Sequence, residues 1–445
     1  MAWWRPSKHV GDGVPADPMG PARAALRDGD APLAVRLLRQ HVRETGSPPL
    51  AELVVDLGRV AGSEHLAAAA AEVAQRPENP RSLHALGYQL FEVGLPELAV
   101  PYLARARDLA PQSGEVLLEL ITALDEGGEH ARSRDLLVAH GGEVDGDPFL
   151  LTYLLCFEHL MVGDVASAVA RRPLLPAPGD AVSQEMQDRL DRMLARAAVV
   201  DRVTTLDDTD LRGWHFVLSG GLLLATSPYG RDDGMNGRWA YLAESYADVA
   251  AGLRRAQDVL RAWGLEPACV VGLPDRGSQA VARAAATLLG VELVAWGTGR
   301  AGLMVAYDLA DSGPEVWEQL GRSRAGSPLY VHATCWTRPE GPAADLTSVL
   351  YQHLVPPWGE QMRAAPGPDG LPGPVEVLPA DDAPSDVLAQ YVVDADPSDA
   401  SWDDAEAGDV VAFATAVRHV TAGAQPSERD RVWPSGPVTS SRFEA

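Results

Sequence analysis

Residues 80–113, with the sequence PRSLHALGYQLFEVGLPELAVPYLARARDLAPQS, decide how the first part of the chain folds. Apolar side chains recur here at the three- and four-residue spacing that places them on one face of a helix. Gly94 separates two such helices, and Pro111 ends the second. Large residues on the first helix meet small ones on the second, so that two antiparallel helices can pack closely. The residues that form this pattern are Leu83, Leu86, Gly87, Leu90, Ala99, Leu103 and Ala106.

The same pattern returns along the first 180 residues. A second unit starts near Gly114, and weaker copies start near residues 15, 48 and 149, with Ala34, Ala67 and Ala168 at the small position. The starts are 33, 32, 34 and 35 residues apart, which favours a repeat over a plain helical bundle, the alternative. The unit resembles the tetratricopeptide repeat at every diagnostic position. This resemblance implies about five repeats over 15–180 in an all-α superhelix that holds a protein or peptide, with a capping helix and linker over 181–205.

The charge of the chain limits its partners. The 445 residues carry a formal net charge of -25, and both nucleic acids and anionic membranes require clustered Lys and Arg. Three cysteines stand far apart, at Cys156, Cys269 and Cys335, without a CxxC pair. No stretch is long and apolar enough for a membrane span. We therefore expect an acidic cytoplasmic protein that binds neither nucleic acid nor membrane.

After residue 200 strands and helices alternate, which indicates an α/β domain with a parallel sheet over 206–358. We predict a hairpin from residues 214–218 and 222–225, followed by an amphipathic helix over 238–263. Strands are expected at 268–273, 291–296, 303–307 and 329–334, and helices at 279–289 and 314–323.

Residues 359–445 form an acidic, Pro/Gly-rich C-terminal segment. We expect most of it to be solvated, because acidic residues far outnumber the single Arg363 between 360 and 409. The apolar runs at 375–378 and 391–393 are expected to dock at sheet edges, and 410–414 to form a last edge strand. The final twenty residues are predicted to be a tail.

The strongest signal for a ligand site is the run LMVAYDLADSG, residues 303–313. An apolar strand delivers Asp308 and Asp311 to its carboxyl end, where ligands bind in open α/β sheets. Ser312 and Gly313 then open a helix, whose free backbone N–H groups could hold a phosphate. The alternative is that Asp308 and Asp311 cap helices and form turns.

This run resembles the phosphoribosyl-pyrophosphate signature of the type I phosphoribosyltransferases. A second match, over 270–291, is similar to the pyrophosphate loop of that family, and the resemblance covers about 238–336. It implies a phosphoribosyltransferase-like domain that binds a nucleotide or sugar phosphate. The implied ligand-binding residues are Asp275, Arg276, Gly277, Ser278, Asp308, Asp311, Ser312 and Gly313, and Asp308 is the candidate catalytic residue.

The departures from the family pattern all weaken catalysis. Tyr307 replaces the first acidic residue, Pro314 removes an N–H from the phosphate cradle, and Glu315 replaces a usual Thr. Residues 297–302 are too few for the family's mobile lid. We therefore expect a domain without phosphoribosyl transfer, which needs no cofactor; Mg²⁺ would be required only in an active site. No metal site is expected.

The resemblance to tetratricopeptide repeats also predicts where a partner binds. The peptide-groove residues are Arg81, His84, Tyr88, Phe91, Glu92, Asp125 and Glu126, whose acids favour a basic peptide. The groove then becomes wholly apolar, at Leu150, Tyr153, Phe157, Leu160 and Met161, and we expect the protein's own second domain or capping helix to cover this end. The function expected is that of a scaffold or adaptor. The alternative is a divergent phosphoribosyl- or nucleotide-handling transferase whose substrate the repeats recruit.

Overall fold

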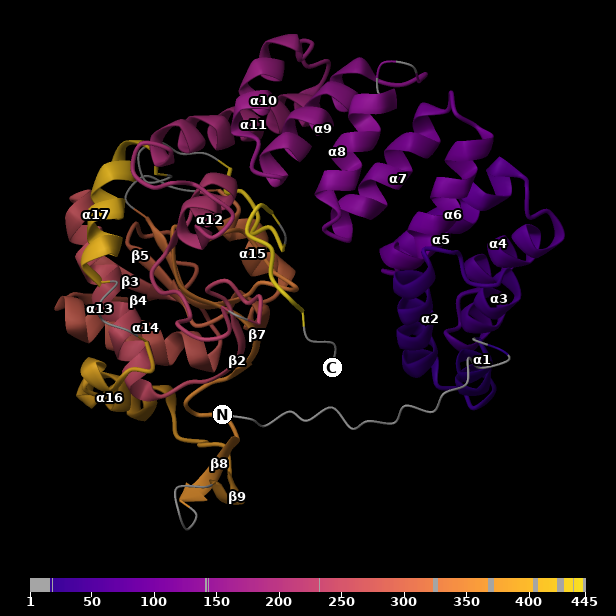
Figure 1. Ribbon diagram of the computed structural model, residues 1–445. Coiled ribbons are helices and arrows are strands. Elements are labelled where there is room, and N and C mark those ends of the chain that lie inside the picture. The colour runs from indigo at the N-terminus through magenta and orange to yellow at the C-terminus, as the bar shows by residue number, and fades with distance from the viewer. Residues whose placement is uncertain are drawn as a thin grey trace. The chain divides into compact units, whose positions relative to one another are not determined.

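The computed structural model describes residues 17, 19–140, 142, 144–231, 233–322, 327–366, 372–402, 407–421, 428–434 and 436–442. The chain divides into two compact units, Met1–Glu158 and His159–Ala445. The described residues are helical up to the first strand at Leu222, and a parallel seven-stranded sheet follows. The expected order, all-α and then α/β, is confirmed (Figure 1). Among the described residues, no helix combines the length and the apolar composition needed to cross a membrane.

The first unit, here called the helical unit, consists of consecutive helices joined by short turns. They are α1 (Gly20–Arg27), α2 (Ala31–Thr45), α3 (Ala51–Val60), α4 (Glu64–Gln75), α5 (Pro80–Glu92), α6 (Pro96–Leu109), α7 (Gly114–Glu126), α8 (His130–His140) and α9 (Pro148–Met161), whose last residues belong to the second unit.

Glycines with positive φ mark the turns of the helical unit. Gly29, Gly62, Gly94 and Gly128 follow α1, α3, α5 and α7 with φ values of 77°, 73°, 76° and 76°. Residues with a Cβ are strained in this left-handed region, so glycine is the residue that ends a helix there at least cost. These four glycines repeat the spacing of 33, 32 and 34 residues found in the sequence.

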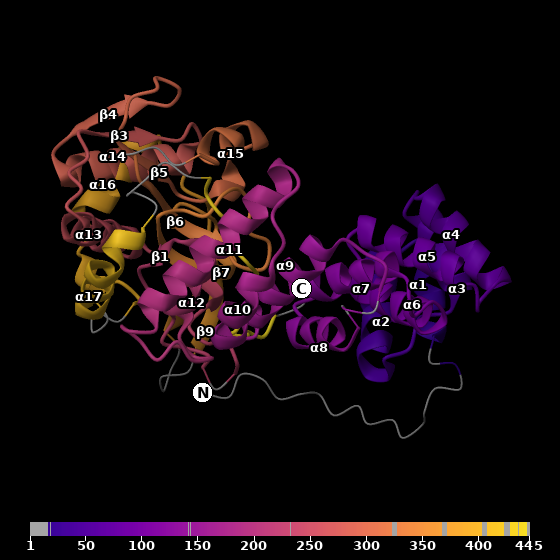
Figure 2. The same ribbon diagram turned by 90° about the horizontal axis from the view of Figure 1, so that it is seen from above.

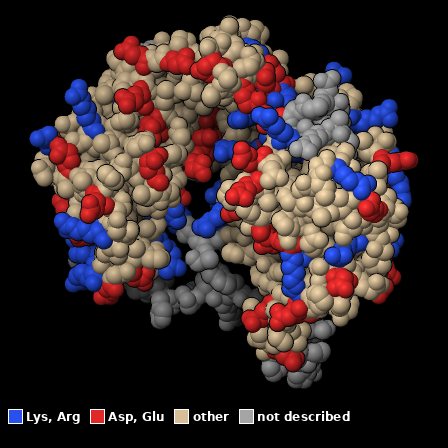
Figure 3. All heavy atoms as spheres, turned by 180° about the vertical axis from the view of Figure 1, so that it is seen from behind, with Lys and Arg blue, Asp and Glu red and all other residues tan. Residues whose placement is uncertain are grey.

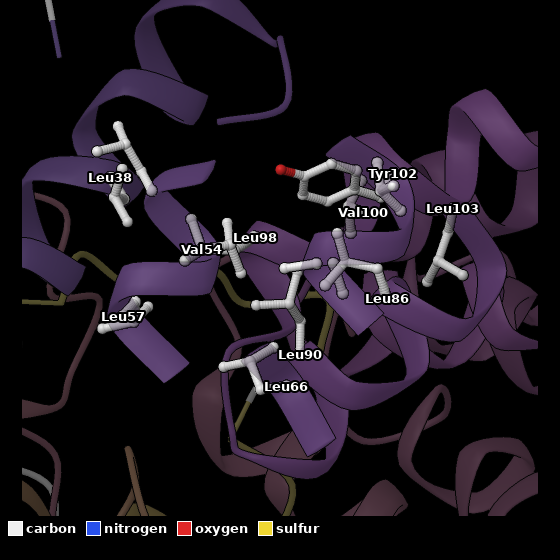
Figure 4. Close-up of a cluster of buried hydrophobic side chains, with 14 of the residues drawn as sticks. Leu38, Val54, Leu57, Leu66, Leu86, Leu90, Leu98, Val100, Tyr102 and Leu103 are labelled. Carbon is white, nitrogen blue, oxygen red and sulfur yellow. The ribbon is translucent and has the colours of Figure 1, made fainter. Parts of the chain in front are cut away.

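The core of the helical unit is built from leucines and valines of neighbouring helices (Figure 4). Its labelled members include Leu38 of α2, Leu57 of α3, Leu66 of α4 and Leu90 of α5. The pairing of large and small residues brings the helices into close contact: a Cβ added at Gly87 would lie 2.4 Å from Leu103 Cγ. Substitution of Gly87 would therefore force α5 and α6 apart.

The second unit, here called the α/β unit, holds a parallel sheet with the strand order β1-β7-β6-β5-β3-β4, and β2 also pairs with β7. The strands are β1 (Leu222–Leu223), β2 (Trp239–Ala243), β3 (Cys269–Gly272), β4 (Glu292–Ala295), β5 (Leu303–Ala306), β6 (Leu329–Cys335) and β7 (Leu346–Val355). The chain runs from β3 outward to β4 and then returns to the other side of β3 to form β5. The carboxyl ends of β3 and β5 therefore flank a topological switch point.

Helices from distant parts of the sequence cover the sheet. α13 (Tyr246–Trp263) and α14 (Arg276–Leu289) contact the strands, and α16 (Ser385–Asp394) and α17 (Ala407–Val417) pack against them in turn (Figure 2). Trp263 Nε1 donates a hydrogen bond to the carbonyl oxygen of Ala414 at 3.1 Å. This outer layer closes the α/β unit.

Four predicted elements are wrong. Residues 214–218 belong to helix α12 (Leu211–Ser219) rather than to a hairpin, and β1 pairs in parallel with β7. Residues 239–243 form β2, not the start of a helix, while 391–393 and 410–414 lie in α16 and α17, not at sheet edges. β9 (Pro372–Leu378) pairs with β8 (Gln361–Pro366) in a separate sheet that projects from the unit (Figure 1). Short apolar runs fit both helix and strand periods, so tertiary contacts decide between them.

The predicted C-terminal tail is also wrong for the described residues 428–434 and 436–442. Val432 and Val438 are 5% and 2% exposed, and Asp430 lies between two arginines of α11 (Ala181–Val200). Arg192 Nη2 and Arg196 Nη2 lie 2.7 and 2.9 Å from its two carboxylate oxygens. Buried charges need such partners, so this segment is an integral part of the α/β unit.

Candidate functional site

The predicted peptide groove lies on α5 and α7. Arg81, Glu92 and Glu126 are exposed, His84 and Phe91 are half-buried, and Tyr88 is 42% exposed. A half-exposed tyrosine offers apolar area and a hydroxyl group at little cost in side-chain entropy, as binding surfaces require.

Carboxylates gather on this same surface. Burial raises the pKa of Glu119, a residue not predicted from the sequence; nearby Glu92 and Glu115 raise it further, and His84 opposes them. These interactions show that α5 and α7 bring their charges close together. The surface formed by Tyr88, Glu92, Glu115, Glu119 and Glu126 is called here the acidic face. The sequence alone could have assigned Glu119 to this face, because it follows Glu115 by four residues on the same helix.

Asp125, also predicted for the groove, has a different environment. It is half-buried, and its Oδ1 lies 3.0 Å from His130 Nδ1 rather than being directed freely to solvent. The free carboxylates of the acidic face are therefore the glutamates. Over the face of the molecule in Figure 3, Asp and Glu are interspersed with Arg.

The predicted apolar end is buried. Tyr153, Phe157, Leu160 and Met161 are each less than 5% exposed, and Leu150 is half-buried. The rings of Phe149, Tyr153 and Phe157 stack along α9 at centroid distances of 6.3 and 6.2 Å. These side chains serve as core, so the acidic face is the accessible part of the predicted groove.

The two predicted phosphate loops meet at the switch point of the α/β unit. Tyr307 N donates to Ser278 Oγ at 2.9 Å, which joins the ends of β5 and α14. Asp275 Oδ1 accepts a hydrogen bond from Ser278 N at 2.7 Å and thereby caps α14. The carboxylate of Asp275 thus occupies N–H groups that a phosphate would need.

The carboxylate of Asp308 is likewise engaged inside the protein. It accepts hydrogen bonds from Ala310 N at 2.9 Å and from the hydroxyl of Tyr351. Burial raises the pKa of Asp308 to about 6, and the charges of Asp311 and Glu340 add to the increase against these hydrogen bonds. These neighbouring negative charges would also repel a pyrophosphate group.

The remaining loop residues leave little room for a ligand. The Arg276 guanidinium donates to the carbonyl oxygens of Asp381 and Ala383, which hold the C-terminal segment across the loop. A Cβ at Gly277 would lie 3.0 Å from Trp358, whose ring is 4.7 Å from that of Tyr307.

The run 311–313 provides no cradle either. Asp311 lies at the surface, where partial desolvation of its carboxylate by the surrounding loop and the charge of Asp275 raise its pKa. The Ser312 hydroxyl is buried without a hydrogen-bond partner among the described residues, and Gly313 precedes the short helix α15 (Pro314–Leu320).

A buried polar network explains the tyrosine at position 307. The Tyr307 hydroxyl donates to Glu244 Oε2 at 2.5 Å, and Glu244 Oε1 lies 2.8 Å from His332 Nε2. Tyr330 connects His332 Nδ1 and Ser348 Oγ, at 2.9 Å each. His332 is 0% exposed, so this network stabilises the fold rather than meeting a substrate. Sequence reasoning missed it because its members come from four separate segments.

The two regions therefore differ in what they can do chemically. The acidic face can hold a cationic ligand at the surface, whereas Asp275, Arg276 and Asp308 at the switch point are bonded to other groups of the protein. No protein-family model and no curated protein matches this chain.

Proposed function

We propose that the protein is an adaptor whose helical unit, of the tetratricopeptide type, binds a basic peptide segment on the acidic face. The observation that carries this proposal is the electrostatic interaction of Glu119 with Glu92 and Glu115, together with the 42% exposure of Tyr88, which lies one helical turn before Glu92 on α5. Lysine or arginine side chains would neutralise the carboxylates, and an apolar or aromatic side chain would cover the tyrosine ring.

The repeat identity rests on two further features. Turn glycines recur at the repeat spacing, and Gly87 permits the close contact of α5 with α6 that the repeat pattern requires. In such repeats the first helix of each hairpin faces the ligand. α5 and α7 are the first helices of their hairpins, and they carry the acidic face.

The α/β unit serves in this proposal as a second module, related in fold to the phosphoribosyltransferases but without phosphoribosyl transfer. The support comes from Asp308, which is buried and hydrogen-bonded, from Arg276, which is bound to carbonyl oxygens, and from Trp358, which packs against Gly277. A transferase would need these groups to be open to substrate.

The test is selection from a random peptide display library on the whole protein, followed by affinity measurement of the selected peptides. We expect enrichment of Lys and Arg and weaker binding at higher salt. Tyr88→Ala should weaken binding by about 5- to 30-fold and Glu119→Gln by about 2- to 5-fold, with nearly unchanged melting temperatures.

Glu64→Gln is the matched control, because Glu64 is exposed on α4, outside the acidic face. Its affinity for the peptides should equal that of the wild type. Selected peptides without basic residues, or basic peptides that bind Tyr88→Ala as tightly as the wild type, would contradict the proposal.

A further inference from the structure

Three metal-ligating side chains converge where helices α7, α8 and α9 meet within the helical unit. Asp125 lies in the last turn of α7, His130 begins α8 and Glu158 lies in α9. His130 Nδ1 is 2.9 Å from Glu158 Oε2 and 3.0 Å from Asp125 Oδ1, and the three donor atoms all lie within 4.8 Å of one another. The side chains of His130 and Glu158 are 4% and 0% exposed, and that of Asp125 is 22% exposed.

His130 cannot donate a hydrogen bond to both carboxylates of this cluster. Nδ1 of an imidazole carries at most one hydrogen, yet two carboxylate oxygens face it at hydrogen-bonding distance. The hydrogen bond goes to Glu158, and Asp125 Oδ1 is buried without a hydrogen-bond donor among the described residues.

Glu158 has the same deficit at its second oxygen. Oε1 is buried and has no partner at hydrogen-bonding geometry among the described residues. A buried carboxylate oxygen without a hydrogen bond is destabilising, because it has lost its water and gained no other partner. A cation between the three side chains would remove both deficits at once.

We propose that Asp125, His130 and Glu158 bind a divalent transition-metal ion, with Zn²⁺ as the best match. One imidazole nitrogen and two carboxylate oxygens are ligands that zinc accepts, and water can complete the coordination. Neighbouring donors of a tetrahedral zinc ion lie about 3.4 Å apart, so the His130 contacts need to open by only about 0.4 Å. The ion enters from the side of Asp125, the most exposed ligand.

The metal ion would act as a clamp on the helical unit. Its ligands come from three successive helices, and the two carboxylates balance its charge. Binding to the folded state alone would stabilise this end of the helical unit. This inference does not depend on the peptide proposal, because it concerns Asp125 and two buried residues rather than the acidic glutamates.

The test uses the whole protein after treatment with a chelator and dialysis. Zn²⁺ should raise the melting temperature of the wild type by about 5–10 °C at a hundredfold excess over the dissociation constant. Co²⁺, whose d–d absorption reports its ligands, should give a visible band. Asp125→Asn and His130→Gln should each weaken Co²⁺ binding by at least about tenfold.

His65→Gln is the control, because His65 is exposed on α4, and it should bind Co²⁺ as the wild type does. Far-UV circular dichroism establishes that each variant is folded; if His130→Gln is not, Asp125→Asn decides, since its side chain is the least buried of the three. A wild type without a Co²⁺ band or Zn²⁺ shift overturns the proposal. So does a response that survives in Asp125→Asn.

Discussion

In the helical unit each helix packs mainly on helices close to it in sequence, whereas the α/β unit is closed by residues from the far end of the chain. Tyr102 reaches 53 positions back to Pro49, while Arg192 pairs with Asp430 across 238 positions. The helical unit is therefore assembled by a local rule that repeats. The α/β unit instead depends on a few long-range contacts. Because these contacts are not repeated elsewhere in the fold, no equivalent contact replaces one that is lost.

The two units also place their polar groups differently. On the acidic face the helical unit exposes Glu92, Glu115 and Glu126, and the α/β unit buries Glu244, His332 and Asp308 among hydrogen-bond partners. Exposed charges contribute little to stability but are available to a ligand, whereas buried ones are costly to leave unpaired. The proposed peptide surface and the network around Glu244 thus lie in different units, and the substitutions below test whether the two units respond independently.

The largest expected effect follows from Asp430→Asn. It leaves Arg196, which is 6% exposed, without its buried counter-charge, at a cost of about 3–5 kcal/mol. Hydrogen exchange should accelerate in α11, β1 and β7 and remain unchanged in α3 to α6. Glu428→Gln is the control, since Glu428 pairs with Arg322 at the surface. Equally faster hydrogen exchange in both units would show that their stabilities are not independent.

Gly252→Ala should cost about 2–3 kcal/mol despite the better helix propensity of alanine. A Cβ on this residue of α13 would lie 2.6 Å from Ser348 Oγ and 2.9 Å from both His332 Nδ1 and the Tyr330 hydroxyl. Urea unfolding measures the loss. Gly313→Ala is the control, because its Cβ would meet nothing within 4 Å. A variant as stable as the wild type would show that the buried network tolerates displacement.

The smallest effect is a pH dependence. The pKa of Asp308 is raised in the folded state from 3.8 to about 6. The folded state therefore favours the protonated carboxyl. The stabilisation from this preference is complete below about pH 4 and is lost as the pH rises through 6. The amide side chain in Asp308→Asn does not titrate. The unfolding free energy of this variant minus that of the wild type should therefore increase by about 2 kcal/mol from pH 4.5 to pH 7.5. If this difference in unfolding free energy does not change with pH, the Asp308 carboxylate is solvated in the folded state and the prediction is wrong.

The sequence predicted the parts of the fold that local periodicity controls. The turn at Gly94, the start of α7 at Gly114 and strands β3 to β6 appear where expected. The strand prediction for residues 410–414 is wrong because their apolar run lacks a clear period; in the structure they lie in α17, which packs on α11 and α13.

The candidate sites show the same limit. The sequence located the two switch-point loops and the exposed Tyr88, but not Glu244, whose partners Tyr307 and His332 lie 63 and 88 positions away. It assigned Asp125 to the groove, since nothing in its local context reveals His130 Nδ1 beside it.

The position of Asp430 near the end of the chain has a consequence during synthesis. Helices α1 to α8 meet their partners soon after they leave the ribosome, because those partners are near in sequence. The α/β unit must wait until the 75 residues from the end of β7 to Asp430 have been added, about 4–15 s at ordinary translation rates. During this interval Arg196 has no counter-charge from Asp430 and the sheet lacks its outer helices, while the acidic face is already formed on the nascent chain.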